Sequence, residues 1–213
     1  MTEQNYDAMR RAMVASQLRT SAVNDARVVA AMGAVPRERF VPRAQASLAY
    51  LDRALPLGGG RALPAPMVLG RLLTEARVRA SDRVLVIGAG SGYAAAVAGE
   101  IAASVIALEE DAQLAGDAAL PANVTVATGP LDRGWDAGAP YDVILFDGAV
   151  EHVPDAIVAQ LAEGGRLAAG IVVHGVTRLA IGTRAGGGFD MVGFAEAEVP
   201  TLPGFANPAA FHF

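Results

Sequence analysis

The sequence predicts an α/β fold in which helices flank a mainly parallel β-sheet. From residue 83 onward, short apolar runs alternate with helical segments, and this alternation is typical of βαβ units that build a parallel sheet. After residue 175, two strand-like runs flank the segment "RAGGG", which predicts an antiparallel hairpin. We therefore expect a parallel sheet that ends in a hairpin, with helices on both faces.

The individual elements follow from runs of β-branched and helix-forming residues. Strands are expected at residues 83–88, 104–109, 123–128, 141–147 and 166–173. Helices are expected at residues 93–103 and 155–162, with a weakly helical segment at 110–119. No linker divides this part of the chain.

The N-terminal part of the chain predicts a helical extension. A helical pattern covers residues 6–19, Asp25 is suited to cap a second helix, and Pro66 is suited to the first turn of a third. We expect residues 1–65 to form the extension with a site loop, and residues 66–213 to form the main domain. The two ranges are expected to make one compact unit.

The composition indicates a packed, mildly acidic chain. Hydrophobic residues make up 53% and charged residues 18% of 213 residues, which argues against disorder. A net charge of -5 without a long basic run argues against a nucleic-acid partner. The absence of cysteine excludes disulfides and a thiolate nucleophile, and we expect no metal site. Without a signal-peptide pattern or a long apolar run, the expected location is cytoplasmic, with no membrane contact.

A glycine-rich turn gives the strongest local signal for function. "VLVIGAGSGY" leaves a strand and enters a helix, and Glu109 ends the next strand, 21 residues after Gly88. Glycines there allow close approach of a ligand, and the acid can accept hydrogen bonds from ribose hydroxyls. We expect a nucleoside-containing cofactor to bind at Gly88, Gly90, Ser91, Gly92 and Glu109. The alternative is that the glycines only permit close packing and that Glu109 is a solvated strand end.

The spacing of the glycines bears on which cofactor binds. The dinucleotide fingerprint G-x-G-x-x-G requires glycine at position 93, where this chain has Tyr93. The observed spacing, G-x-G-x-G, suits S-adenosylmethionine, which has no pyrophosphate to hold. The spacing favours the methyl donor and disfavours a nicotinamide-dependent oxidoreductase without settling the choice.

Four motifs along the chain are similar to those of one protein family. They are "MVASQLRTSAVNDARVVAAMGAVPRERFVP", "AYLDRALPLGGG", "DRVLVIGAGSGYAAAVAGEIAASVIALE" and "QLAEGGRL". With these motifs the chain resembles the protein-L-isoaspartate O-methyltransferase family over nearly its whole length. The motifs are specific in combination.

The resemblance implies both a fold and a reaction. The implied fold is a Rossmann-like, seven-stranded S-adenosylmethionine-dependent methyltransferase sheet with a C-terminal antiparallel hairpin and an N-terminal helical extension. The implied reaction is protein repair, in which a methyl group from S-adenosyl-L-methionine esterifies L-isoaspartyl residues of a damaged protein or peptide. The oligomeric state is left open.

The chain departs from the family pattern in the loop "GGGRALPAP". Family members carry Thr and Ser hydroxyls where this chain has Ala62 and Pro64. Val86 and Pro130 also replace polar residues that approach the cofactor in the family. Arg61 and Pro64 are the candidate catalytic residues on the substrate side, where Arg61 could pair with a substrate carboxylate. The alternative is a non-catalytic or repurposed member that binds S-adenosylmethionine or another protein.

Two further residues follow the strand at 141–147, at the edge where parallel sheets bind ligands. Asp147 ends that strand, and His152 lies just beyond it. His152 could face the transferred methyl group or lie in an exposed loop. His174 and His212 have no partner at a metal-ligand spacing.

Overall fold

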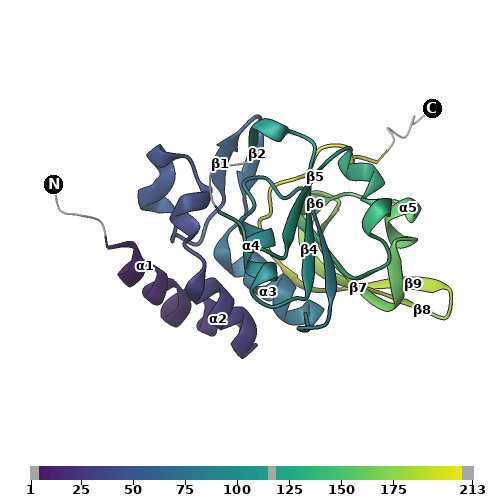
Figure 1. The fold of residues 1–213 in the computed structure, drawn as a ribbon, viewed down its shortest axis with the longest axis horizontal. Helices are drawn as coiled ribbons and strands as arrows, with labels where there is room; N and C mark the ends of the chain where they lie inside the picture. Colours follow the sequence, from purple (N-terminus) through teal and green to yellow (C-terminus); the bar gives the residue numbers. More distant parts are fainter. Residues whose placement is uncertain (1–4, 115–118, 208–213) are drawn as a thin grey trace.

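A seven-stranded sheet runs through the middle of the molecule (Figure 1). The computed structural model describes residues 5–114 and 119–207. The strands of the main sheet are β3 (Arg83–Ile87), β4 (Ser104–Glu109), β5 (Val124–Thr128), β6 (Tyr141–Val150), β7 (Leu161–Val173), β8 (Val176–Ala185) and β9 (Gly188–Glu196). They lie in the order β5-β4-β3-β6-β7-β8-β9, and a separate ribbon pairs β1 (Leu55–Gly58) with β2 (Arg61–Leu63).

The pairing directions confirm a parallel sheet that ends in an antiparallel hairpin. β3 pairs in parallel with β4 and β6, β4 with β5, and β6 with β7. β8 is antiparallel to both β7 and β9. Because β4 and β6 lie on opposite sides of β3, the strand order reverses there, and open α/β sheets bind ligands outside the carboxyl ends of strands at such a point. We call the side of the sheet at which the parallel strands end the carboxyl edge, and the side at which they begin the amino edge.

The helices begin where the sequence predicts. They are α1 (Tyr6–Met13), α2 (Ala26–Ala34), α3 (Pro66–Ala76), α4 (Tyr93–Gly99) and α5 (Asp155–Val158). Asp25 caps α2 by accepting a hydrogen bond from the Arg27 N–H at 2.8 Å, and Pro66 occupies the first turn of α3. The helical pattern over residues 6–19 continues past α1 as a π-helical turn and a 3-10 turn.

Two apolar layers cover the two faces of the sheet. Side chains alternate along β3, so Val84 and Val86 enter one layer while Leu85 and Ile87 enter the other. The first layer packs residues of α2, α3 and α4 against the sheet. The second layer is covered by short 3-10 turns, α5 and the C-terminal segment around Phe205.

The helix expected over residues 155–162 is shorter than predicted. α5 ends at Val158, because the chain already pairs with the start of β6 a few residues later. The Tyr141 N–H donates to the Gln160 carbonyl at 2.8 Å, and Leu161 is the register partner of Tyr141. Strand pairing with the sheet therefore outweighs local helix propensity here, and the predicted end of the helix is wrong.

Some predictions are only partly covered by the described residues. Of the weakly helical segment at 110–119, a 3-10 turn spans Ala112–Leu114, whereas residues 115–118 lie outside the described ranges. His212 lies outside them as well. The division at residue 65 stays a prediction.

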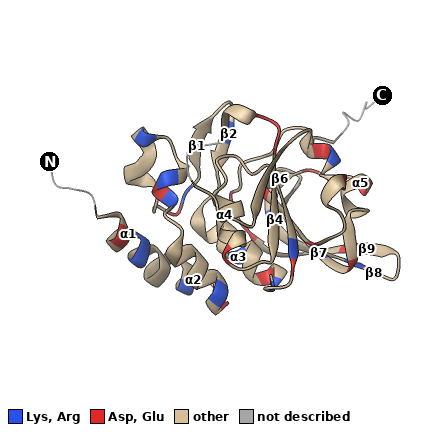
Figure 2. Cartoon of the chain, in the orientation of Figure 1, with Lys and Arg blue, Asp and Glu red and all other residues tan. Residues whose placement is uncertain are grey.

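Over the visible elements, basic and acidic residues are interspersed (Figure 2).

Candidate functional site

The turn between β3 and α4 has a backbone that requires glycine. Gly88, Gly90 and Gly92 have φ angles of +75°, +53° and +94°, which other residues rarely adopt. The N–H groups of Gly88 and Ala89 both donate to the Leu108 carbonyl at 3.0 Å, so the turn is held against the end of β4. The glycines therefore serve the conformation of the turn as well as its close packing.

Glu109 lies directly beside this turn at the end of β4 and is only 3% exposed. Its Oε2 accepts a hydrogen bond from the Gly90 N–H at 2.7 Å. Its Oε1 accepts from the N–H groups of Glu110 and Asp111 at 2.9 and 3.2 Å. The residues expected to bind a cofactor are thus in direct contact, and Glu109 is not a solvated strand end.

Arg61 contributes a further donor to the same carboxylate. It begins β2, is 8% exposed, and its Nη1 lies 2.7 Å from Glu109 Oε1. Its Nη2 donates to the Gly88 carbonyl at 3.0 Å. The structure therefore brings a residue expected on the substrate side into contact with residues expected to bind the cofactor. In this arrangement the guanidinium is engaged with Glu109 and the glycine turn.

Two leucines lie against the glycine turn. A Cβ atom on Gly88 would come within 2.6 Å of Leu202 Cδ2, and one on Gly90 within 3.0 Å of Leu57 Cδ1. Leu202 is held at the carboxyl edge because its N–H donates to the Ala149 carbonyl at 2.8 Å. The cradle made by the glycines is therefore filled by side chains of this chain.

Ser91 ties the turn to the N-terminal extension. Its Oγ donates to the Phe40 carbonyl at 2.5 Å. A hollow of about 270 Å³ opens beside this contact, between the extension, the β1–β2 ribbon and the glycine turn. Its lining residues are Arg39, Phe40, Val41, Pro42, Leu57, Ser91, Gln113 and Leu114.

Asp147 and His152 lie at the neighbouring end of β6. Burial raises the pKa of Asp147 to about 7, against the opposing effect of the Arg37 and Arg61 charges, and the Glu109 charge raises it further. The Nδ1 atom of His152 is buried and has no hydrogen-bond partner among the described residues. Asp147 is thus a buried acid whose protonation changes near neutral pH.

Arg37 is a residue of this region that the sequence analysis did not single out. It is fully buried, and its Nε and Nη2 donate to the carbonyls of Ala49 and Pro64 at 2.8 and 2.6 Å. Its guanidinium also lies 4.7 Å from the centroid of the Tyr93 ring. The available sequence signal was the arginine that follows the first proline of the motif segment "VPRERFVP". Pro64, predicted on the substrate side, is therefore anchored by Arg37 through its backbone, while Ala62 is half-buried in β2.

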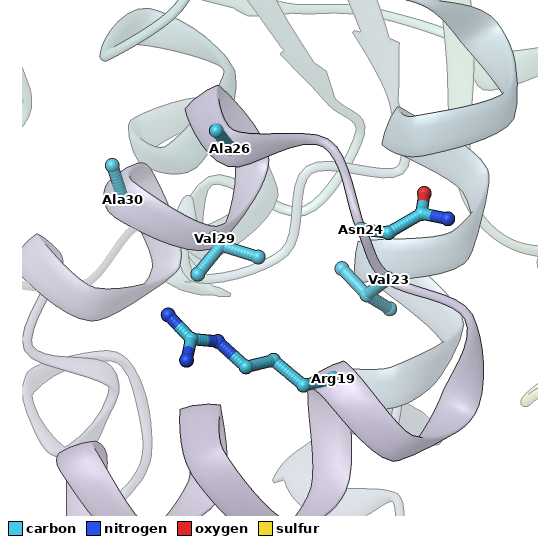
Figure 3. Close-up of a pocket in the computed structure, with 6 residues that line it drawn as sticks. All are labelled: Arg19, Val23, Asn24, Ala26, Val29 and Ala30. Carbon is cyan, nitrogen blue, oxygen red and sulfur yellow. The ribbon is translucent and has the colours of Figure 1, made fainter.

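A larger hollow, of about 530 Å³, lies away from the glycine turn. Figure 3 shows its lining, which comes from the N-terminal helices: Arg19, Val23, Asn24, Ala26, Val29 and Ala30. Volume alone therefore does not locate the site. Within residues 5–114 and 119–207, no three His, Asp or Glu side chains gather as a possible metal site. Among the same residues, no helix combines the length and the apolar character needed to cross a bilayer.

Comparison with known proteins identifies the family. The sequence model described as protein-L-isoaspartate(D-aspartate) O-methyltransferase matches residues 8–188. The chain belongs to this family. A protein-L-isoaspartate O-methyltransferase 1 from Rhodopseudomonas palustris (strain HaA2) is 42% identical over 169 residues, which are 76% of this chain and 69% of that protein. A protein-L-isoaspartate O-methyltransferase from Methylorubrum populi is 41% identical over 166 residues, covering 76% of this chain and 78% of the relative.

Solved structures of the protein-L-isoaspartate O-methyltransferase type share the fold. One has a TM-score of 0.76 at 23% identity and covers 92% of this chain and 66% of that chain. Another, from Plasmodium falciparum and in complex with S-adenosyl-L-homocysteine, has a TM-score of 0.75 at 18% identity and covers 94% of this chain and 99% of that chain. These findings confirm the predicted family, the methyltransferase fold and S-adenosylmethionine as the family's cofactor.

The site residues fit an adenosine-containing cofactor in type and position. A buried carboxylate at the end of β4 faces glycines with positive φ at the point where the strand order reverses. The guanidinium of Arg61 contacts this carboxylate, and the side chain of Leu202 packs beside Gly88.

Proposed function

We propose that this chain transfers a methyl group from S-adenosyl-L-methionine to the carboxylate of L-isoaspartyl residues in damaged proteins or peptides. The observation that carries the proposal is the buried Glu109 carboxylate, 2.7 Å from the Gly90 N–H at the carboxyl edge. In a chain of this family, that carboxylate and the turn Gly88–Gly92 are suited to hold the ribose and the rest of the cofactor. The proposed location is cytoplasmic.

Methyl transfer to a carboxylate does not require acid–base catalysis by side chains. S-adenosylmethionine supplies an electrophilic methyl carbon bonded to a sulfonium sulfur. A substrate carboxylate has an ordinary pKa of about 4 and is already ionised at neutral pH, so no general base is needed. The residues of this chain have to align the two partners and exclude water. Leu57, which packs against the glycine turn, is suited to water exclusion.

The substrate side is proposed to be walled by the β1–β2 ribbon and the loop that follows it. Arg61 and Pro64 lie there, but neither Ala62 nor Pro64 has a side-chain hydrogen-bond donor. A lost neutral hydrogen bond costs about 0.5–1.5 kcal/mol, and two such losses lower the rate by about tenfold to a hundredfold if both align the substrate. We therefore propose weak rather than absent isoaspartyl methylation.

The test is a methyl-transfer assay with S-adenosylmethionine labelled on the methyl group. The acceptors are an isoaspartyl peptide and the same peptide with ordinary aspartate. The expected result is base-labile label on the isoaspartyl peptide alone. The absence of label on both peptides, together with retained binding of S-adenosylhomocysteine, would favour the alternative of a non-catalytic or repurposed family member.

A loop variant sharpens this test. The double change Ala62→Thr with Pro64→Ser restores both hydroxyls, and the Pro64 carbonyl that accepts from Arg37 remains available in the serine. We expect about a tenfold or larger gain in isoaspartyl methylation. An unaltered chain that is already as fast as a family member with both hydroxyls would contradict the account based on lost donors.

A further inference from the structure

We propose that Arg61 and Leu202 occupy the cofactor cradle as an internal plug, so that S-adenosylmethionine binds only when the Arg61–Glu109 ion pair opens. Arg61 would thereby set the affinity of this chain for its cofactor. The inference rests on the proposed function in one respect, which is the placement of the cofactor at Glu109.

The first argument is that the Oε1 atom of the Glu109 carboxylate is already fully engaged by hydrogen-bond donors of this chain. A carboxylate offers about four acceptor positions. The four donors supplied by the described residues are the N–H groups of Gly90, Glu110 and Asp111 and the Nη1 of Arg61, at 2.7 to 3.2 Å. Oε1 accepts three of these hydrogen bonds and Oε2 only the one from Gly90, so the ribose hydroxyls can engage both carboxylate oxygens only if a donor leaves Oε1.

The second argument is that Arg61 is the donor able to leave. The other three are backbone N–H groups of the glycine turn and of the two residues that follow β4. Moving them would disturb the end of the sheet. Arg61 reaches Glu109 from a different element, with a long side chain whose rotation leaves the backbone of β2 in place. The exchange of a side-chain donor for the cofactor costs the least rearrangement.

The third argument is that a second side chain closes the same space. A Cβ atom on Gly88 would lie 2.6 Å from Leu202 Cδ2 and 3.0 Å from Arg61 Nη2, so both side chains border the same point of the turn. Leu202 belongs to a C-terminal segment that is attached to β6 through the Ala149 backbone and through an edge-to-face contact of Phe205 with Phe146. Arg61 thus occupies the space beside Glu109, and Leu202 occupies the space beside Gly88.

The contrary interpretation is that the ion pair only stabilises the fold. The chain provides a matched control for it, because Arg166 pairs with Asp82 at the amino edge, and Asp82 is also buried. Loss of either arginine costs stability. Only loss of Arg61 is expected to change cofactor affinity, since Arg166 lies at the opposite end of the strands.

The experiment measures binding of S-adenosylhomocysteine to the full chain by calorimetry, and the ligand-induced rise in melting temperature as a second readout. The proteins are the unaltered chain, Arg61→Gln, Leu202→Ala and the control Arg166→Gln. We expect Arg61→Gln to bind at least tenfold more tightly than the unaltered chain, and Leu202→Ala to bind more tightly by a smaller factor. Arg166→Gln should bind as the unaltered chain does.

The outcomes separate the plug from the proposed function. If the unaltered chain binds and neither Arg61→Gln nor Leu202→Ala binds more tightly, the plug is wrong and the proposed cofactor site stands. If no protein binds, opening the pair has revealed no site, and the proposed function fails together with the plug. If Arg166→Gln tightens binding as much as Arg61→Gln, the effect reflects a loosened fold and the plug is overturned. Should Arg61→Gln fold poorly, Leu202→Ala carries the same test without touching the ion pair.

Discussion

The two edges of the parallel sheet each carry a buried arginine–carboxylate pair, and the pairs have different surroundings. At the carboxyl edge, Arg61 and Glu109 side chains are 7% and 4% exposed, and at the amino edge, Arg166 and Asp82 side chains are 15% and 5% exposed. The chemistry of the two pairs is the same. Their neighbours determine whether a pair can only hold the fold or can also give way to a ligand.

The amino-edge pair joins the residue before β3 to a residue inside β7. Asp82 precedes β3 and accepts a hydrogen bond from the Arg79 N–H at 2.9 Å, while its carbonyl accepts from Ala103 and Ser104 at the start of β4. Arg166 comes from β7. Both partners are therefore attached to the main sheet, and we expect this pair to affect stability but not cofactor binding.

The carboxyl-edge pair joins the sheet to an irregular ribbon. Arg61 follows Gly58, Gly59 and Gly60, which have φ angles of +104°, +56° and +76°. Glu109 keeps three backbone donors even without Arg61. Glu109 is thus fixed at the end of β4 and keeps its backbone hydrogen bonds without its partner, while Arg61 is attached to a short ribbon. The contrast predicts unequal effects of substitution, from which the two pairs can be distinguished.

The largest effect is expected for Glu109→Ala. It leaves the Arg61 guanidinium buried without its hydrogen-bonded carboxylate, although its Nη2 still donates to the Gly88 carbonyl, and breaking a buried pair in this way costs about 3–5 kcal/mol in the free energy of unfolding. Arg61→Ala should cost clearly less, because Glu109 retains its backbone donors. Urea denaturation of both variants measures the difference.

The double variant Glu109→Ala with Arg61→Ala completes this comparison. It should be no less stable than Glu109→Ala alone, since no charge is left buried and unpaired. Equal losses for the two single variants would contradict the asymmetry. Binding of S-adenosylhomocysteine should be lost whenever Glu109 is replaced, whatever occupies position 61.

The next largest effect is expected for Asp82→Ala at the amino edge. Arg166 then loses its carboxylate partner while 15% exposed, so water compensates in part, and we expect a loss of about 2–3 kcal/mol in the free energy of unfolding. Affinity for S-adenosylhomocysteine, measured well below the melting temperature, should stay within about twofold. A cofactor-specific loss of binding would show that the two edges are coupled.

Asp147 gives a pH-dependent effect of intermediate size. Burial raises its pKa to about 7, above the value of about 3.9 in an unfolded chain, so the folded state favours the protonated acid. The contribution of protonated Asp147 to the free energy of unfolding is fully present below pH 4 and is lost as the pH rises toward 7. The stability of Asp147→Asn relative to the unaltered chain should therefore increase by about 2 kcal/mol as the pH rises from 5 to 8.

The measurement for Asp147 is urea denaturation of both proteins across that pH range. The quantity of interest is the difference between variant and unaltered chain, because other carboxylates cancel in it. A difference that does not change with pH would mean that Asp147 is ionised throughout the range. The Arg37 and Arg61 charges would then dominate over burial at this end of β6.

The elements of the fold were predictable because local patterns and tertiary contacts agree over most of the chain. The β-branched run at β3, the Asp25 cap and the hairpin of β8 and β9 each formed where the sequence indicated. The prediction failed at the end of α5, where helix-forming residues lie beside a strand that offers pairing to Leu161. That competition depends on the position of Tyr141 in space, which no local pattern contains.

The sequence indicated which residues lie together at the carboxyl edge, but not how they are connected. The spacing of Gly88 and Glu109 indicated that both belong to one site, and they do lie in contact through Gly90. The pairing of Arg61 with Glu109 spans 48 positions in the sequence, and the packing of Leu202 on Gly88 spans more than twice that. Such contacts between distant segments follow from the folded topology and leave no periodic trace.

The smallest effect concerns Ser91, which belongs to the glycine turn but has no contact with the ion pair among the hydrogen bonds of the described residues. Its Oγ donates to the Phe40 carbonyl at 2.5 Å, a contact that fixes the turn to the N-terminal extension. Ser91→Ala removes one part-buried hydrogen bond, so we expect a loss of about 1 kcal/mol in the free energy of unfolding. If the hydroxyl acts only through this contact, affinity for S-adenosylhomocysteine should change by less than about threefold, and Ser91→Thr, which keeps the hydroxyl, should recover most of the lost stability. A loss of cofactor affinity that exceeds the loss of stability would instead place Ser91 among the groups that hold the cofactor, and the carboxyl edge would then bind its ligand through a side chain as well as through Glu109 and the glycine backbone.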